Sequence, residues 1–256
     1  MAGTRFRLVK AGLATAVIRR LAPDGRAGEE TPDLLAAEEA FSLVLGGRPR
    51  AVLEASPGGE AALAAGYCLT MGLLDPAAPA PRVAWDPAAR TVTLEAVALA
   101  QAPAQRRRPP REPGAFPATR AAALPEVMRR RQESFERSGA THAAALFNRA
   151  GEMLVLAEDL GRHSALDKAA GTLWLAGELG EAWALALSGR CNLEMLEKAA
   201  RSGVELVASV SAATAAAAAR AGELGLTLLG FCRSGRANIY SHPARLSYSE
   251  GDETHA

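Results

Sequence analysis

Six apolar runs between residues 142 and 241 decide the fold. They are HAAALF (142–147), EMLVLAED (152–159), AWALALS (182–188), VELVASV (204–210), LTLLGF (226–231) and ANIYS (237–241). Short apolar runs bounded by turn signals are typical of buried strands. Segments with helical spacing separate most of them, at roughly 162–179, 191–201 and 213–224. Apolar strands that alternate with such helices predict a layered α/β sheet with helices on both faces.

The preceding residues, 1–100, predict a smaller β-rich part with one helix. The segment EAFSLVLGGRPRAVLEA (39–55) places a Gly-Gly pair between two alternating runs, which indicates a β-hairpin followed by the helix. A second pair of strands is expected within 82–99, with its turn at Asp86-Pro87. The first 35 or so residues carry scattered glycine, proline and acidic residues, and we expect an edge of the fold there rather than a domain.

A basic, proline-rich segment separates these two parts. Residues 101–118, QAPAQRRRPPREPGAFPA, contain five prolines and no periodicity, so we predict a flexible loop. A helix is expected from Leu124 to Arg137, within an α/β core that spans 119–256. Between Gln105 and Arg131 eight arginines oppose two glutamates, a local charge of +6. This stretch either binds an anion or is a solvated face.

The composition limits the classes of function. The chain has 256 residues, 49% hydrophobic and 22% charged, with a net charge of +1, which provides ample material for a buried core. It has no apolar run of about 18 residues and no signal-peptide core, so we expect a cytoplasmic protein with neither a membrane span nor a nucleic-acid partner. The cysteines, Cys68, Cys191 and Cys232, form no CxxC and no zinc-site spacing, so no metal site is predicted.

Three polar clusters follow predicted strands, where open α/β sheets bind ligands and helix N-termini favour anions. The first cluster contains Gly161, Arg162 and His163 and runs into Asp167 and Lys168. His163 and Asp167 are four residues apart on one predicted helix face, so the carboxylate can orient the imidazole. A helix cap followed by a surface pair explains the same residues without a ligand.

The second cluster is Ser188, Gly189 and Arg190, between a strand and its helix. Serine and glycine before a helix suit an anion, and the arginine adds a planar fork of donors. The tripeptide is common, so a simple turn is the alternative. In the helix that follows, Glu194 and Lys198 are spaced as a stabilising surface pair.

The third cluster lies between the last two strands and comprises Arg233, Ser234, Gly235, Arg236 and Asn238. Two arginines around a glycine turn form a phosphate clamp, although ordinary hairpin chemistry also explains the Ser-Gly pair. A further candidate is His142, at the start of a strand, where a buried structural histidine is the alternative.

Four motifs in order resemble one family. They are SGATHAAALF (138–147), EDLGRHSALDKAAG (158–171), SGRCNLEMLEKAARSGVELVASVSAATAAAA (188–218) and GLTLLGFCRSGRANIY (225–240). Together they resemble FdhD, the accessory sulfurtransferases of formate dehydrogenase, over most of residues 138–241. The segment PGGEAALAAGYCLTMGLL (57–74) is similar to the N-terminal helix of that family.

The resemblance implies a cytidine-deaminase-like core with a smaller N-terminal β-containing part, and a homodimer. Family members accept sulfur from a cysteine desulfurase and pass it to the molybdenum cofactor of formate dehydrogenase, bis-molybdopterin guanine dinucleotide. A guanine nucleotide is expected to mimic this cofactor. The deaminase zinc signature is missing, so zinc hydrolysis is not expected. The cofactor-binding segment of the family carries over to Phe231, Cys232, Arg233, Ser234, Gly235 and Arg236, and the other clusters and His142 are expected to join it.

One departure from the family is serious. Its sulfur carrier is a cysteine of a CxxC in the loop that here reads QAPAQRRRPPREPGAFPATR, without cysteine. Persulfide chemistry needs a thiolate, for which only Cys191 and Cys232 are candidates, and a helix N-terminus can lower the pKa of a thiol such as that of Cys191. Three functions stay open: a sulfurtransferase accessory protein, a non-catalytic cofactor or guanine-nucleotide binding and delivery protein, and a regulatory partner of a relative that has the CxxC.

Overall fold

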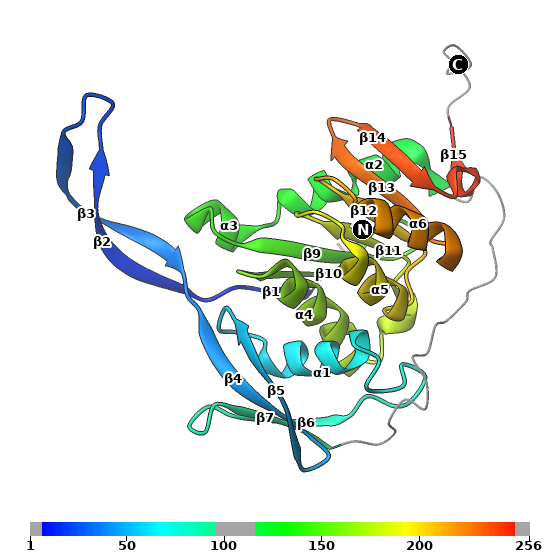
Figure 1. The fold of residues 1–256 in the computed structure, drawn as a ribbon, viewed down its shortest axis with the longest axis horizontal. Coiled ribbons are helices and arrows are strands. Elements are labelled where there is room, and N and C mark those ends of the chain that lie inside the picture. Colours follow the sequence, from blue (N-terminus) through cyan, green and yellow to red (C-terminus); the bar gives the residue numbers. More distant parts are fainter. Residues whose placement is uncertain (1–6, 96–115, 249–256) are drawn as a thin grey trace, which may run out of the picture.

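A seven-stranded sheet forms the centre of the computed structural model, which describes residues 7–95 and 116–248 (Figure 1). Its strand order is β1-β10-β9-β11-β12-β13-β14. All six apolar runs identified in the sequence contribute strands to this sheet. The strands are β1 (Arg7–Val9), β9 (His142–Phe147), β10 (Met153–Asp159), β11 (Ala184–Leu187), β12 (Leu206–Ser209), β13 (Thr227–Arg233) and β14 (Arg236–Ser241).

The strand directions bring several chain turns to one edge of the sheet. β11, β12 and β13 are parallel to one another, whereas β9 runs antiparallel to both β10 and β11. The carboxyl ends of β10, β11, β12 and β13 therefore share one edge, together with the first residue of β9. We call this the C-terminal edge. All three polar clusters follow strands that end there.

Helices cover both faces of the sheet, so the expected mixed α/β fold is confirmed. On one face lie α4 (Arg162–Leu175), α5 (Leu193–Arg201) and α6 (Ala215–Leu224), with α1 (Glu60–Thr70) packed against α4. On the other face lies α2 (Ala118–Arg129). The predicted helix 162–179 ends earlier, at Leu175, and a 3₁₀ turn, η1 (Leu179–Glu181), follows it. No helix in the described ranges is both long and apolar enough to span a membrane.

A four-stranded sheet forms the smaller N-terminal part and packs near α1 (Figure 1). The predicted Gly-Gly turn is confirmed, because Gly46 and Gly47 both have positive φ, of 57° and 76°. The predicted turn at Asp86 is also confirmed, and the carboxylate accepts the N–H groups of Ala88 and Ala89. Predicted strand residues after Glu95 lie outside the described ranges. The four strands are β4 (Glu39–Leu45), β5 (Arg48–Ala55), β6 (Arg82–Asp86) and β7 (Thr91–Glu95).

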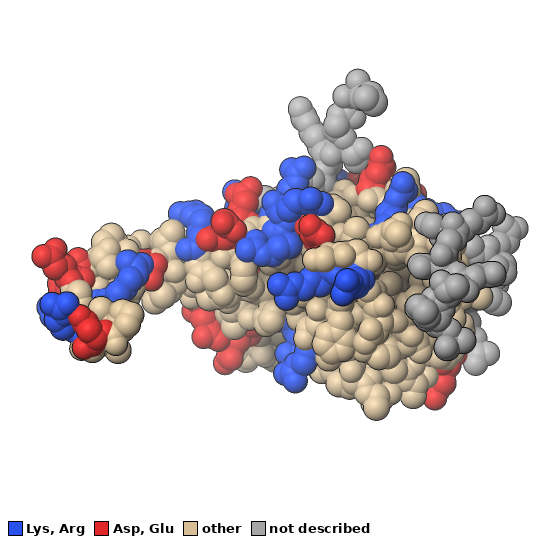
Figure 2. All heavy atoms as spheres, turned by 90° about the horizontal axis from the view of Figure 1, so that it is seen from above, with Lys and Arg blue, Asp and Glu red and all other residues tan. Residues whose placement is uncertain are grey.

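The N-terminal residues, expected to form an edge of the fold rather than a domain, form an ordered arm. β2 (Leu13–Leu21) and β3 (Ala27–Ala36) pair into a long two-stranded arm that projects from the body (Figure 1). Acidic and basic side chains are interspersed along it (Figure 2), and Arg19 pairs across the strands with Glu30. A ribbon exposed on both faces lacks the apolar alternation that marks a half-buried strand, so its sequence gave little strand signal.

The predicted helix 124–137 is two helices, α2 and the short α3 (Glu133–Ser138). The break occurs because the buried carboxylate of Glu158 accepts the N–H groups of Ser134 and Phe135 and so starts a new helix. Most of the predicted loop 101–118 lies outside the described residues. Its end forms β8 (Phe116–Pro117), which pairs with β15 (Leu246–Ser247), a strand that follows the 3₁₀ turn η2 (Pro243–Arg245).

Candidate functional site

His142 and the second cluster meet at the C-terminal edge. The Oγ of Ser188 accepts the backbone N–H of Ala143 at 2.8 Å and lies 3.3 Å from Nδ1 of His142. A Cβ atom on Gly189 would lie 3.3 Å from the His142 ring and 3.4 Å from Cδ of Arg162. Glycine therefore allows His142 and Arg162 to approach the turn after β11, and residues of the first two clusters form one polar group.

The electrostatics of this group favour an anion. Burial, together with the nearby guanidinium of Arg162, lowers the pKa of His142, which keeps the imidazole neutral near pH 7. The Nε of Arg162 is buried and has no hydrogen-bond partner within the described ranges. Arg190, which ends the second cluster, is exposed. The group thus offers guanidinium donors that the protein itself does not saturate.

Two serines that the sequence reasoning missed connect this group to the third cluster. The Oγ of Ser209 donates to the carbonyl of Gly189 at 2.6 Å and accepts the N–H of Ser211 at 3.2 Å. The carbonyl of Ser211 in turn accepts the N–H of Phe231 at 3.0 Å. Serines directly after a buried strand were the available signal, because hydroxyl groups often bond to nearby backbone at such turns.

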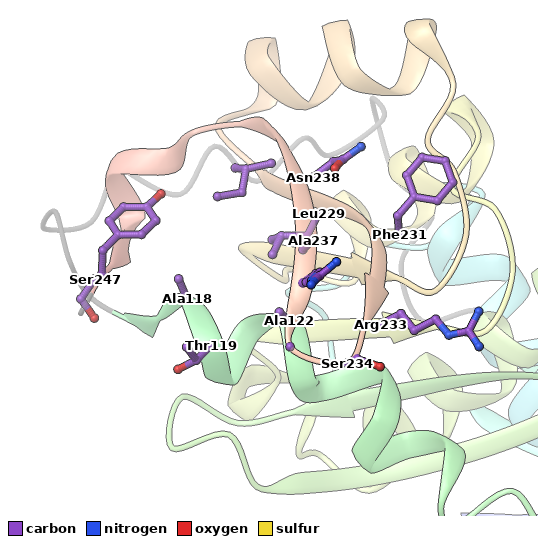
Figure 3. A pocket seen from close by; sticks show the side chains of 14 residues that line it. Ala118, Thr119, Ala122, Leu229, Phe231, Arg233, Ser234, Ala237, Asn238 and Ser247 are labelled. Atoms are coloured by element: carbon purple, nitrogen blue, oxygen red, sulfur yellow. The ribbon is translucent and has the colours of Figure 1, made fainter. Parts of the chain in front are cut away.

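The third cluster lines a cavity of about 860 Å³ (Figure 3). Ser234 and Gly235 form the tight turn between β13 and β14, with φ of 51° and 75°. Phe231 also has positive φ, of 54°, and is 51% exposed. A bulky residue in this conformation is strained, a feature that concentrates at ligand sites. Arg233 and Arg236 face each other across the turn and are exposed.

The rest of the cavity comes from residues that no sequence motif marked. Ala118, Thr119 and Ala122 of α2 line it, as do Ser247 and Tyr248 at the end of β15. Their contribution depends on the pairing of β15 with β8, which no local pattern reveals. None of the residues of the first two clusters lines this cavity. The three clusters therefore share the C-terminal edge, whereas this cavity belongs to the third cluster.

Asp167 and Lys168 are corrections to the candidate ligand set. Both are buried, with 2% and 0% exposure. The Nζ of Lys198 lies 2.7 and 2.9 Å from the carboxylate oxygens of Asp167, and the Nζ of Lys168 lies 2.7 Å from Asp159. These charges neutralise one another inside the protein, because burying an unpaired charge is costly. The first pair joins α4 to α5 and the second joins α4 to β10, so neither side chain reaches a surface ligand.

Two side-chain pairs that the sequence predicted do not form, because the packing of the helices selects other partners. His163 forms no hydrogen bond or ion pair with Asp167, and its Nε2 lies 3.5 Å from Glu194 on α5. Glu194 does not pair with Lys198, which turns inward to Asp167. Burial lowers the pKa of His163, with Glu194 acting in the opposite direction. Helical spacing identified the shared faces, but the packing of α1, α4 and α5 selected the partners.

All three cysteines are buried and poorly placed to act as nucleophiles. Cys68 and Cys191 are fully buried, and Cys232 is 4% exposed. Burial raises the pKa of each thiol to about 12. The expectation that a helix N-terminus could lower the pKa of Cys191 is wrong, because desolvation dominates. These thiols are core side chains.

Comparison with known proteins gives a consistent result. The FdhD/NarQ family model matches residues 96–247. The sulfur carrier protein FdhD of Streptomyces avermitilis is 32% identical over 253 residues, covering 84% of this chain and 90% of the relative. The protein of the same name from Saccharolobus solfataricus is 41% identical over 124 residues, 48% of each chain. The crystal structure of a proposed formate dehydrogenase accessory protein from Desulfotalea psychrophila shares the fold, with a TM-score of 0.75, 22% identity, and coverage of 93% of this chain and 100% of that one.

Proposed function

The chain belongs to the FdhD/NarQ family, and from this premise we propose that it serves formate dehydrogenase as an accessory protein that binds and delivers the molybdenum cofactor. One observation carries the proposal. Arg233 and Arg236 are exposed at the cavity turn, and their guanidinium groups form no ion pair or hydrogen bond with any described residue. Unsaturated guanidinium groups on a tight turn suit the phosphates of bis-molybdopterin guanine dinucleotide.

Two other residues of the cavity also suit this cofactor. The exposed ring of Phe231 offers a face for a planar heterocycle such as guanine. The amide of Asn238 supplies both a donor and an acceptor for the edge of such a ring. The volume of about 860 Å³ lies toward the upper end of the roughly 300–1,000 Å³ that ligand pockets occupy. Along the edge, Arg162 and Arg190 can meet further negative charge.

We propose that the chain binds and delivers the cofactor without forming a persulfide of its own. The relatives are named sulfur carriers, but sulfur transfer requires an accessible thiolate. This sequence has three cysteines, and all of them are buried with a raised pKa. Formate dehydrogenase as client, and the homodimer implied by the resemblance, remain predictions.

Guanosine diphosphate is the practical probe of the cavity. Arg236→Ala is expected to weaken its binding by about 1.5–3 kcal/mol, roughly 10- to 150-fold, because a charge-assisted hydrogen bond is lost. Isothermal titration calorimetry at constant salt measures the change. Salt must be fixed because exposed charge pairs are screened by ions.

Arg48→Ala is the matched control, because Arg48 is an exposed arginine that begins β5, outside the cavity. It is expected to leave the affinity for guanosine diphosphate unchanged. Equal losses in the two variants would indicate a general effect of positive charge. Unchanged binding after replacement of both Arg233 and Arg236 would mean that the cavity is not the nucleotide site.

A labelling experiment separates delivery from sulfur transfer. After incubation with a cysteine desulfurase and ³⁵S-cysteine, we expect no label on the native chain, because none of its thiols is both exposed and ionised. Non-reducing electrophoresis followed by autoradiography measures the label. A family member with the CxxC is the positive control. Label that disappears in Cys191→Ser or Cys232→Ser would reject the delivery-only proposal.

A further inference from the structure

Tyr248 is an aromatic residue that lines the cavity, and no sequence motif identified it. It is 55% exposed and lines the same cavity as the arginine turn. Its hydroxyl donates to the carbonyl oxygen of Pro243 at 3.1 Å. Since this bond restrains the ring, Tyr248 presents a surface whose orientation is set before any ligand arrives.

The segment that carries Tyr248 is firmly anchored. Arg245, just before β15, donates to the carbonyl oxygens of Glu205 and Gly225 and to the hydroxyl of Thr227, at 2.8–2.9 Å. Leu246 is 3% exposed and pairs with Phe116 in the two-stranded β8–β15 sheet. Side chains held by such a rigid support are suited to positioning a ligand.

Phe231 and Tyr248 belong to different sides of the cavity. Figure 3 shows Ser247, the residue before Tyr248, on the opposite side from Phe231 and Arg233. Ala118 and Ala122 lie between them in that view, and Leu229 and Ala237 also line this stretch of the cavity. The arginine turn is therefore flanked by one aromatic residue, and a second aromatic residue lies on the other side of the cavity.

We propose that Tyr248 stacks against a second planar ring of the ligand, while the phosphates contact the arginine turn and the first ring contacts Phe231. The proposal rests on the proposed function and deepens it. The cofactor of the proposed function is a dinucleotide, with two heterocycles joined through phosphates, and so has a second ring for Tyr248 to contact. Tyr248 is then a specificity-determining residue, because a mononucleotide does not use it.

The test compares guanosine diphosphate with diguanosine pyrophosphate, which carries a second guanine but no additional phosphate. The wild-type chain is expected to bind the dinucleotide about tenfold more tightly, on the scale of stacking one base on an aromatic side chain. Tyr248→Phe keeps the ring but loses the hydrogen bond to Pro243, so it is expected to retain most of this advantage. Tyr248→Ala is expected to bring the ratio of the two affinities close to one. Arg48→Ala, outside the cavity, is expected to keep the tenfold ratio.

Two outcomes would overturn the assignment: equal wild-type affinity for both probes, or a dinucleotide advantage that survives in Tyr248→Ala. If guanosine diphosphate binds in an Arg236-dependent way while the dinucleotide gains nothing, the role of Tyr248 fails and the proposed function stands. If neither probe binds the wild-type chain, both fail together.

Discussion

Asp167→Ala is expected to lower the free energy of unfolding by about 3–5 kcal/mol, since removing one partner of a buried ion pair leaves the other charge uncompensated. The carboxylate contacts the ammonium of Lys198 and accepts the hydroxyl of Thr70 at 2.6 Å. These three residues come from α4, α5 and α1, so their loss affects the packing of all three helices. Urea denaturation followed by circular dichroism measures the change.

Arg19→Ala is the control for this prediction, because it removes an exposed pair with Glu30 on the projecting arm. Its expected effect is below about 1 kcal/mol. Adding Lys198→Met to Asp167→Ala is expected to restore part of the stability, since an apolar side chain tolerates burial. A loss of similar size in Asp167→Ala and Arg19→Ala would show that burial does not set the energetics of these pairs.

Gly66→Ala is expected to destabilise the protein by about 3 kcal/mol, at the upper end of the usual range for overpacking. A Cβ atom at Gly66 would overlap the carbonyl oxygen of Asp167, and one at Gly171 would overlap that of Ala62. The atoms that such a Cβ would overlap belong to the backbone, so moving a side chain could not relieve the overlap. Helices α1 and α4 would have to separate. Thermal unfolding measures the loss as a lower midpoint.

Gly222→Ala is the matched control for the same substitution. Gly222 lies in α6, and a Cβ atom there has no neighbour within 4 Å. Because alanine favours the helix over glycine, this variant is expected to gain roughly 0.5–1 kcal/mol. If both glycine variants lost stability equally, the close crossing of α1 and α4 would not be the cause of the loss in Gly66→Ala.

The apolar patterns of the sequence predicted the central sheet because β9 to β12 and most of β13 are buried, whereas the edge strand β14 is mostly exposed. Mostly apolar runs such as VELVASV and LTLLGF favour interior strands. The placement of polar clusters after strands was informative for the same reason, since it follows from strand direction alone. The Gly-Gly turn at 46–47 was predictable because its backbone conformation is one that glycine adopts easily.

The parts that escaped prediction depend on contacts between distant segments. The partner of Asp167 is 31 residues away on another helix, and helical spacing alone pointed to His163 instead. Tyr248 joins the cavity only because β15 pairs with β8. The projecting arm has no buried face, so it lacks the apolar alternation on which strand prediction relies.

The hydrogen bonds of Ser209 and Ser211 also fix the distance between two turns of the C-terminal edge. Ser209 and Ser211 join the turn after β11 to the backbone of Phe231 through hydrogen bonds that involve no ligand. The separation between the Arg190 turn and the Arg233 turn is therefore set by the protein in advance. If both turns contact one ligand, as the proposed function requires, this fixed distance would disfavour compounds whose negative charges are spaced differently.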